Sequence, residues 1–254
     1  MAPAAERDHK GDYGIDGSFH RVSARGQAIG IAAYAAILAL WAGINLARGA
    51  VLTAALLGAV VIGVAASVAL YMYATKAGKF EVWNRTLDDL QLQGDETVLD
   101  MGCGRGAVLL AAAKRLPRGR AIGVDLWQAD QTDNSPSATL ANAELENVAD
   151  RIELHTGDMT ALPLDDNSVD VIVSSLAIHN IPTHAGRREA LGEAMRVLRP
   201  GGRLAIADLW DTRQHADHLR ERGWQNVQRR RVGWRMWYGG PWVSTRLVTA
   251  TKPG

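Results

Sequence analysis

The sequence has very little cysteine and almost no net charge. Cys103 is the only cysteine among 254 residues, so an intrachain disulfide and a cysteine metal cluster are both excluded. Twenty-eight Lys and Arg residues balance 27 Asp and Glu residues, which leaves a net charge of +1. This balance does not indicate a nucleic-acid-binding protein, and we expect neither a nucleic-acid partner nor a metal site. The run Arg229–Arg231 is local. We interpret it as the solvated edge of a strand, with a site for an anionic partner as the alternative.

Charged residues are also missing from two long stretches near the N-terminus. None lies within 28–47 or within 50–75, and each stretch reaches the roughly 20 residues that a bilayer-spanning helix needs. Small residues recur every fourth position, which lets two helices approach closely in lipid. They form two stripes: Ala35, Ala39, Gly43 and Ala47, and Ala55, Ala59, Gly63 and Ser67. We therefore predict a transmembrane helical hairpin over residues 28–75 in a lipid bilayer. A buried hairpin in a soluble protein is the alternative.

Basic residues near the two stretches indicate the orientation of this hairpin. Arg48 is alone in the turn between the stretches, whereas five basic residues flank their other ends. These are Arg21, Arg25, Lys76, Lys79 and Arg85. The positive-inside rule then predicts a multi-pass membrane protein whose termini and catalytic part are cytoplasmic. Aromatic residues expected near the membrane interfaces are Trp41, Tyr71 and Tyr73.

Residues 1–27 are polar and lack a long apolar run, so we interpret them as a mobile or loosely ordered arm. The segment Tyr13-Gly14-Ile15-Asp16-Gly17 stands out as a turn with an aromatic residue. A plain surface turn is the favoured interpretation, and a lid over the active site is the alternative.

Residues 80–254 alternate between patterns typical of strands and of helices. We expect strands near 97–101, 121–126, 151–156, 169–175 and 202–208. We expect helices near 80–92, 106–116, 137–147, 185–198 and 212–222. Two further extended segments, near 224–233 and 242–251, are joined by an aromatic turn and indicate a terminal hairpin. Such alternation predicts an α/β domain with a parallel sheet and helices on both faces.

The stretch from Val98 to Gly106 organises this domain. An apolar strand ends at an acid, a triple-glycine turn follows, and an alanine-rich helix begins, which is the geometry that brings backbone close to a ligand. The spacing Gly102-x-Gly104-x-x-Ala107 also fits the relaxed dinucleotide fingerprint. Asp100, however, would face a pyrophosphate unfavourably. It suits a ligand with a cationic end, such as the amino group and sulfonium of S-adenosylmethionine.

Three further motifs agree with this interpretation in order and spacing. They are Gly123-Val124-Asp125, Gly157-Asp158-Met159 through Leu162-Pro163, and Leu198 to Leu204, which we expect just before the fifth strand. Together the four motifs resemble class I S-adenosylmethionine-dependent methyltransferases over roughly residues 80–252. They are similar in style to the enzymes of ubiquinone and menaquinone synthesis. The resemblance implies a Rossmann-like, seven-stranded methyltransferase sheet and S-adenosyl-L-methionine as the cofactor.

The cofactor site is expected at the ends of the first three strands. Asp125 follows the glycine turn by about twenty residues, where an acid accepts hydrogen bonds from ribose hydroxyls. The resemblance implies that Asp158 and the Met159 backbone meet the adenine. It also implies that Asp100 either holds the methionine amino group or braces the glycine turn. The complete set of candidates is Asp100, Gly102, Cys103, Gly104, Asp125, Leu126, Trp127, Gly157, Asp158, Met159 and Ser175.

Two of these candidates have alternative interpretations. Trp127 either stacks beside the adenine or anchors its loop by packing. Cys103 is most simply a small spacer in the glycine turn, and a redox or nucleophilic role is the alternative.

The segment 174–182 follows the fourth strand and would face the transferring methyl group. His179 is the candidate catalytic residue, as a general base on an O–H, N–H or S–H group, because histidine exchanges protons near neutral pH. Alternatively, it orients the loop through Asn180 and a backbone carbonyl. The segment lacks the Asn/Asp-Pro-Pro-aromatic signature of many amino-methylating enzymes, which disfavours DNA adenine and protein glutamine as substrates.

These patterns together predict a membrane-anchored methyltransferase that acts on a small, lipophilic or membrane-delivered acceptor. Its alternatives are a protein methyltransferase and a membrane-tethered S-adenosylmethionine-binding protein without turnover. Quinone-methylating enzymes lack such a hairpin, so the resemblance does not identify the acceptor. The sequence leaves the oligomeric state open.

Overall fold

The computed structural model of the protein describes residues 9–17, 24–128, 131 and 133–254. Two predicted features therefore fall partly outside the described residues. They are residues 1–8 and 18–23 of the polar arm and, in the basic flank of the hairpin, Arg21 and the side chain of Arg25.

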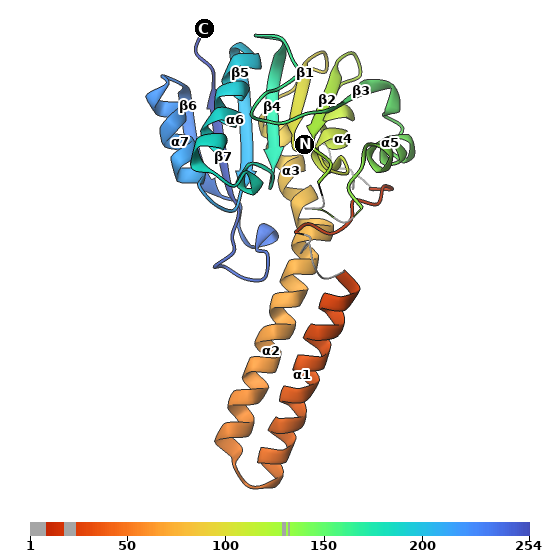
Figure 1. Cartoon of the computed structure of the whole chain (residues 1–254), viewed down its shortest axis with the longest axis vertical. Helices are drawn as coiled ribbons and strands as arrows, with labels where there is room; N and C mark the ends of the chain where they lie inside the picture. The colour runs from red at the N-terminus through yellow and green to blue at the C-terminus, as the bar shows by residue number, and fades with distance from the viewer. Residues whose placement is uncertain (1–8, 18–23, 129–130, 132) are drawn as a thin grey trace, which may run out of the picture.

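One seven-stranded sheet forms the centre of the large domain, in the order β3-β2-β1-β4-β5-β7-β6 (Figure 1). Its strands are β1 (Thr97–Met101), β2 (Arg120–Asp125), β3 (Ile152–Thr156), β4 (Val169–Ser175), β5 (Leu198–Asp208), β6 (Gln225–Arg231) and β7 (Arg246–Thr251). The first five are parallel, and β7 runs antiparallel to both of its neighbours. The predicted α/β class, the seven strands and the terminal hairpin of β6 and β7 are confirmed.

The strand order reverses between β1 and β4, which are neighbours although β2 and β3 lie between them in the chain. In open parallel sheets, ligands bind beyond the carboxyl ends of the strands at such a reversal. The segments after β1, β2, β4 and β5 therefore meet at one edge of the sheet. Figure 1 shows this edge turned toward the helical hairpin.

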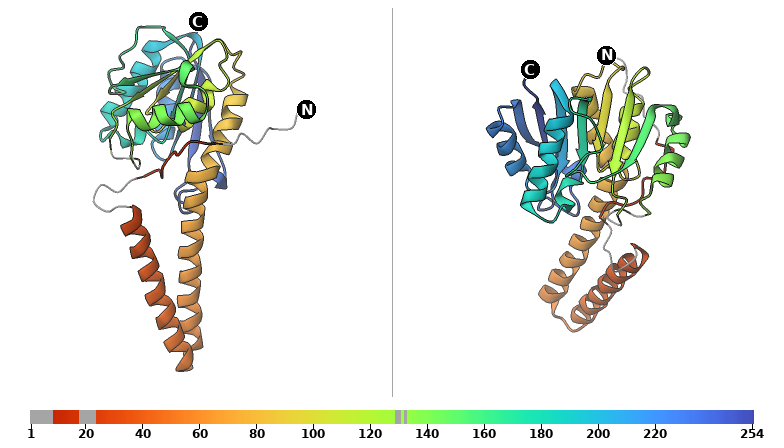
Figure 2. Two further views of the ribbon diagram at one scale, coloured as in Figure 1. Left: turned by 90° about the vertical axis from the view of Figure 1, so that its right-hand side faces the viewer. Right: turned by 45° about the horizontal axis from the view of Figure 1, so that its top comes forward.

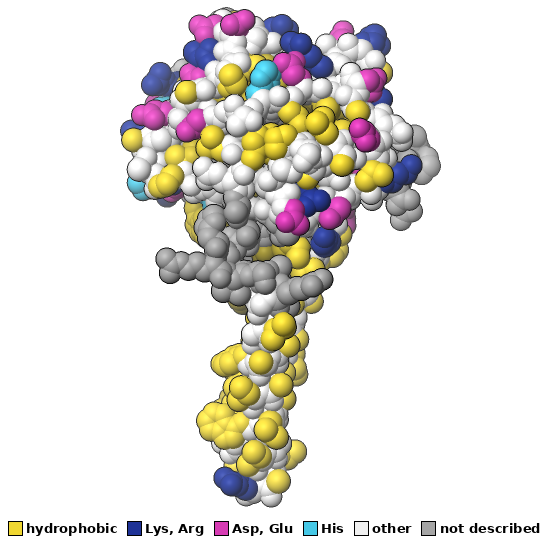
Figure 3. Space-filling view, turned by 45° about the vertical axis from the view of Figure 1, so that its right-hand side comes forward, with side chains coloured by type: hydrophobic (Ala, Val, Ile, Leu, Met, Phe, Trp, Pro, Cys, Tyr) yellow, Lys and Arg dark blue, Asp and Glu magenta, His cyan; other side chains and the backbone are white. Residues whose placement is uncertain are grey.

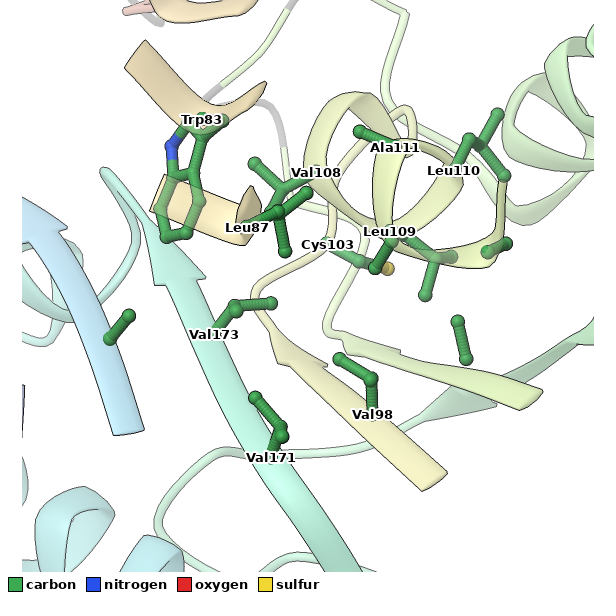
Figure 4. Close-up of a cluster of buried hydrophobic side chains, with 14 of the residues drawn as sticks. Trp83, Leu87, Val98, Cys103, Val108, Leu109, Leu110, Ala111, Val171 and Val173 are labelled. Carbon is green, nitrogen blue, oxygen red and sulfur yellow. The ribbon is translucent and has the colours of Figure 1, made fainter. Parts of the chain in front are cut away.

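Helices cover both faces of the sheet because successive strand residues point to opposite faces. Val98 packs with one set of helices and Leu99 with the other. The first set is α3 (Lys79–Asp89), α4 (Ala107–Ala113) and α5 (Pro136–Leu145), and the second is α6 (His184–Val197) and α7 (Thr212–Glu221). Figure 4 shows Trp83 of α3 and Leu109 of α4 over Val171 of the sheet, in the first of these two apolar layers.

The predicted hairpin is present as α1 (Ala24–Ala47) and α2 (Val51–Tyr73), which project away from the sheet (Figures 1 and 2). Both helices are long and apolar enough to cross a membrane, and almost none of their described side chains is buried. Apolar side chains cover the visible face of the hairpin, while acidic side chains on this face are confined to the domain above (Figure 3). This exposure does not match a buried hairpin of a soluble protein, the alternative considered above.

One unbroken helix joins the hairpin to the sheet domain. The π-helix η1 (Ala74–Gly78) follows α2 directly and continues into α3, so the chain is helical from Val51 to Asp89. The sequence predicted a separate helix at 80–92. The helix continues because no proline lies between Tyr73 and Lys79. The one glycine in this stretch, Gly78, has a helical backbone (φ −58°, ψ −40°).

The loop between β6 and β7 packs against this junction. Trp234 stacks on Tyr73 with ring centroids 4.9 Å apart, and Arg235 Nε donates to Glu81 Oε2 at 2.7 Å. Gly78 makes the approach possible, since a Cβ at this position would lie 1.8 Å from the carbonyl oxygen of Arg235.

The fifth strand begins earlier than predicted. The motif Leu198 to Leu204 lies inside β5, whereas the sequence placed it before a strand starting near 202. Leu198 pairs with Val169, and Gly201 N–H donates to the Lys252 carbonyl at 2.9 Å, so β4 and the end of β7 extend the pairing.

We expect Gly78→Ala to destabilise the protein by about 1–3 kcal/mol, because the added methyl group has no space beside the Arg235 carbonyl. Gly192→Ala is the matched control. It also adds a methyl group inside a helix, but nothing lies within 4 Å of the new atom. This control should leave stability unchanged or raise it by up to about 1 kcal/mol. Thermal unfolding of the full chain measures both, and equal shifts for the two variants would show that the loop does not depend on Gly78.

Candidate active site

The glycine turn begins where β1 ends. Gly102 has φ +75°, a region that favours glycine, and a Cβ at this position would lie 2.2 Å from the Cβ of Ala177. Its N–H donates to the Val124 carbonyl at 2.8 Å. The turn after β1 is therefore held against β2 on one side and against the segment after β4 on the other.

Asp125 fixes the same turn from the end of β2. One carboxylate oxygen accepts from the Gly104 N–H at 2.8 Å. The other accepts from the Trp127 N–H at 2.7 Å and from Asn134 Nδ2 at 3.3 Å. The side chain is buried, and it lines the two cavities described next.

Two adjoining cavities open on either side of Gly102 and Asp125. The first, of about 250 Å³, lies beside the ends of β2 and β3. It is lined by Gly102, Asp125, Leu126, Gln128, Gly157, Asp158, Met159, Thr160, Ala177, Asn180, Ile181 and Pro182. The second, of about 360 Å³, lies beside the ends of β4 and β5 and reaches α2. It is lined by Asp16, Gly17, Tyr71, Gly102, Gly104, Asp125, Gln131, Ser175, Leu176, Ala177, His179, Asn180, Leu209, Trp210, Tyr238 and Val243.

The first cavity brings together most of the predicted nucleoside-binding residues. Leu126, Gly157, Asp158 and Met159 all line it. Asp158 is exposed, and its Oδ1 accepts from the Thr160 N–H at 2.8 Å. This arrangement fits a ribose near Asp125 and an adenine near Met159.

Trp127 does not line either of these cavities. Its indole N–H donates to Thr156 Oγ1 at 2.8 Å, and the ring packs against the core beneath α4. The position of Trp127 matches the packing anchor, the second of the two predicted interpretations.

Asp100 is a buried carboxyl group with an unsatisfied oxygen. It is 1% exposed, and its Oδ1 has no hydrogen-bond partner among the described residues. Burial, together with the neighbouring charge of Asp125, raises the pKa of Asp100 to about 8. Asp100 lines a small space of about 50 Å³ between the glycine turn and Lys79. Such a group is poised to be paired by a cationic ligand.

Cys103 lies in the glycine turn as a small, buried residue. A Cβ on Gly123 would be 2.7 Å from its sulfur, so the thiol fills the space that Gly123 leaves. Burial and the carboxylates of Asp100 and Asp125 raise the pKa of the Cys103 thiol well above its ordinary value. A protonated, buried thiol is a poor nucleophile, which favours the spacer role.

His179 is oriented by a carboxylate that the sequence analysis missed. Asp208 Oδ1 lies 2.5 Å from His179 Nδ1, and Asp208 Oδ2 accepts from the His179 backbone N–H at 3.0 Å. Asp208 is fully buried, and the edge of the imidazole meets Trp210 at 5.2 Å between centroids. Orientation through Asn180, the predicted alternative to the base role, stays a prediction, and Asp208 is the partner of the imidazole that the structure shows. Asp208 ends β5, and this position at the ligand-binding edge was the available signal.

Ser175 also lines the second cavity, at the end of β4. Its Oγ accepts from the indole N–H of Trp83 at 2.8 Å. This bond ties α3 to the site, so the helix that continues from the hairpin contacts the candidate active site directly.

The segment 9–17 is packed onto the domain, so the predictions of a loosely ordered arm and a plain surface turn are wrong for this part of the chain. Tyr13 is buried against Phe80, with ring centroids 5.1 Å apart, and its hydroxyl donates to Glu146 at 2.8 Å. Arg105 Nε donates to the Asp12 carbonyl at 2.8 Å. These contacts place the segment over the glycine turn, as the lid interpretation requires.

Asp16 connects this segment to the helix and to the site. Its carboxylate forms an ion pair with Lys79 at 2.8 Å and accepts from the Tyr238 hydroxyl at 3.1 Å. Its backbone N–H donates to Thr75 Oγ1 at 2.9 Å, and its carbonyl accepts from the Tyr71 hydroxyl. Lys79 was predicted as part of the basic membrane flank. That prediction is wrong, because Lys79 is buried and pairs with Asp16 instead.

No group of three or more His, Cys, Asp or Glu side chains that could hold a metal ion occurs among the described residues. The polar side chains that line the two cavities are carboxylates, hydroxyls, carboxamides and one imidazole.

Comparison with known proteins identifies the domain around the glycine turn. Residues 99–206 match the model of the methyltransferase domain family. This chain contains a methyltransferase domain. A solved S-adenosylmethionine-dependent methyltransferase from Aquifex aeolicus has the same fold, with a TM-score of 0.53 and 21% identity over 66% of this chain and 88% of that one. The predicted resemblance to class I methyltransferases is confirmed.

Two curated relatives indicate the chemistry of similar domains. A ubiquinone/menaquinone biosynthesis C-methyltransferase of Dinoroseobacter shibae is 36% identical over 132 residues, 52% of this chain and 50% of that protein. An arsenite methyltransferase of Halobacterium salinarum is 35% identical over 125 residues, 49% of this chain and 30% of that protein. The chain thus spans half or less of the length of these relatives.

We expect Asp100→Asn to stabilise the unliganded protein in a pH-dependent way. The pKa of the Asp100 carboxyl rises from 3.8 in the unfolded chain to about 8 in the folded protein. Between these two values the carboxyl is protonated in the folded protein and ionised in the unfolded chain. Wild-type stability therefore falls as pH rises between about 4 and about 8, whereas the neutral asparagine escapes this loss. Thermal unfolding across this range measures the effect. Asp95→Asn, an exposed carboxyl change, is the control, and parallel curves for the two variants would contradict the prediction.

Proposed function

We propose that this protein transfers a methyl group from S-adenosylmethionine to a small, lipophilic acceptor that reaches the site from a bilayer. The observation that carries the proposal is the second cavity. Its lining runs from Gly102 and Asp125, beside the nucleoside cavity, past His179 to Tyr71 of the apolar helix α2. Relatives named for quinone and arsenite methylation support a small acceptor.

The cofactor fits the residues that are present. S-adenosylmethionine, when bound, supplies a methyl group that its sulfonium already activates. Asp125 would accept from the ribose hydroxyls, and Asp158 and Met159, which line the same cavity, would contact the adenine. Asp100 offers an unpaired carboxyl oxygen to a cationic group, which supports its assignment to the methionine amino group. The first cavity, at about 250 Å³, suits the nucleoside part.

The acceptor end of the site is mainly apolar. The second cavity has apolar walls from Leu176, Leu209, Trp210 and Val243, and polar side chains line its remaining parts. Small-molecule sites typically combine such walls with a few placed polar groups that fix orientation. Tyr71 and Tyr238 line this cavity beside Asp16, and their rings contact each other edge to face. These features support a lipophilic acceptor.

His179 is the candidate base. Its Nδ1 is engaged by the buried carboxylate of Asp208, which leaves Nε2 as the ring nitrogen available to the cavity. Asp208 would act as a positioning residue that fixes the ring and its tautomer. Nε2 could then accept the proton that an O–H, N–H or S–H acceptor releases as the methyl group arrives.

The membrane part of the proposal rests on α1 and α2. Both helices meet the length and hydropathy of membrane spans, and they are exposed. Lys76 is exposed just beyond the apolar stretch of α2, while Arg48 is alone at the far turn. This asymmetry supports a catalytic domain on the cytoplasmic side. Because α2 continues into α3, anchoring would hold the second cavity close to the bilayer surface.

Labelled methyl transfer tests the proposed function. The full chain is incubated with methyl-labelled S-adenosylmethionine and either the lipid-soluble or the aqueous fraction of a cell extract. We expect label in a small molecule of the lipid-soluble fraction, which mass spectrometry identifies. Label confined to proteins would favour protein methylation. Cofactor binding without any transfer would favour the non-catalytic interpretation.

His179 and Asp208 can be tested with the labelled product. If His179 is the base, His179→Ala should lower turnover about 10²–10⁴-fold with little change in cofactor affinity, and activity should partly recover at high pH. Asp208→Asn should lower turnover in the same direction and change its pH profile, since it alters the partner of Nδ1. Unchanged turnover in both variants would assign the pair a purely structural role.

A further inference from the structure

Three arginines lie on one face of the sheet edge formed by β6 and β7. Arg231 pairs directly with Arg246 across the two strands. Arg229 is two residues earlier on β6, so its side chain leaves the same face as that of Arg231. Arg229 Nε donates to Thr212 Oγ1 at 2.9 Å, which places this face on the side of α7. Arg230 points to the opposite face and pairs with Asp89 of α3.

The charges of this arginine cluster (Arg229, Arg231 and Arg246) are not balanced by acids. Among the residues that the structure describes, none of the three forms an ion pair with a carboxylate. Asp208 pairs with Arg246 in the strand register, but its carboxylate is occupied by His179 and by the Leu209 N–H. Burial and the nearby charges of Arg231 and Arg229 lower the pKa of Arg246. Like charges directly opposite each other destabilise a sheet, so an anionic partner would relieve this repulsion.

The cluster lies at the end of the domain that adjoins the hairpin. Residues 232–245 connect Arg231 to Arg246, and Figure 1 shows this loop descending beside the top of α2. Trp234 stacks on Tyr73, the last residue of α2, where the apolar part of the hairpin ends. Trp234 is 46% exposed and Trp242 is 75% exposed. Exposed tryptophans at the end of an apolar helix are typical of a membrane–water interface.

We propose that the arginine cluster, with the exposed tryptophans Trp234 and Trp242, is a second membrane contact that binds anionic phospholipid headgroups. This inference rests on the membrane anchoring in the proposed function. A lipid surface is favoured over a soluble anion because the cations lie on the last two strands of the sheet, and the loop that joins these strands carries the exposed tryptophans and packs at the end of α2. The contact would fix the tilt of the domain on its helical stalk and hold the second cavity toward the bilayer.

Lipid-dependent quenching of tryptophan fluorescence tests this contact in the full chain. The protein is placed in nanodiscs of phosphatidylcholine, with or without phosphatidylglycerol, that contain a headgroup-labelled nitroxide lipid. We expect phosphatidylglycerol to increase quenching of the wild type, because docking brings Trp234 and Trp242 to the headgroups. Arg231→Gln/Arg246→Gln should abolish the increase, since one arginine near an anionic surface is worth about fivefold in binding and two about 25-fold. Trp242→Phe should reduce the lipid-dependent part of the signal.

Arg118→Gln/Arg120→Gln is the matched control, because it removes the same charge around the start of β2, a strand four places away from β7 in the sheet. The control should behave as the wild type. Equal responses of the wild type, the Arg231→Gln/Arg246→Gln variant and the control would overturn the contact while leaving the anchoring intact. A wild type that does not respond to phosphatidylglycerol would do the same. Loss of the wild-type response on adding inorganic phosphate at constant ionic strength would identify a soluble anion site and also overturn it. A chain that does not enter nanodiscs would contradict the anchoring and this contact together.

Discussion

The unbroken helix from Val51 to Asp89 is the constraint on which the arrangement of the molecule depends. Its first part is apolar and exposed, its middle part holds Asp16 through Thr75 and Lys79, and its last part packs against the sheet through Trp83. Because the helix is continuous, the orientation of α2 determines the orientation of the candidate active site. The same helix contributes Tyr71 to the second cavity and a hydrogen bond to Ser175, which links the hairpin to the proposed chemistry.

Electrostatics in the site favour a cationic ligand. Asp125 uses its carboxylate to hold the glycine turn, while Asp100 beneath it keeps one oxygen without a partner and a raised pKa. An unpaired carboxyl group in the core lowers the stability of the fold, as is common for residues of a preformed binding site. Asp208 shows the opposite case, because it is buried and fully used in orienting His179. The site thus holds one buried carboxyl group with an unpaired oxygen beside the glycine turn and one fully paired carboxylate beside His179.

Local patterns predicted most of the fold, and contacts between distant residues account for what they missed. The glycine turn, Asp100 and Asp125 could be located because strand, turn and helix follow one another within a few residues. The packing of Tyr13 on Glu146 joins residues 133 positions apart, and no local pattern encodes it. Lys79 looked like a membrane-flanking cation because its partner, Asp16, lies on a segment that sequence alone did not fold. Asp208 could have been predicted as a site residue, since it ends a predicted strand at the ligand-binding edge.

The most direct test of the whole account is to ask from which bilayer the acceptor arrives. The full chain is placed in nanodiscs, and the lipid-soluble acceptor fraction is supplied either in the same discs or in separate protein-free discs, with methyl-labelled S-adenosylmethionine in solution. A cavity that opens beside α2 predicts much faster transfer to acceptor in the same discs. Equal rates from both sources would contradict the account, because they would mean that the acceptor reaches the site through water and that the hairpin does not deliver it.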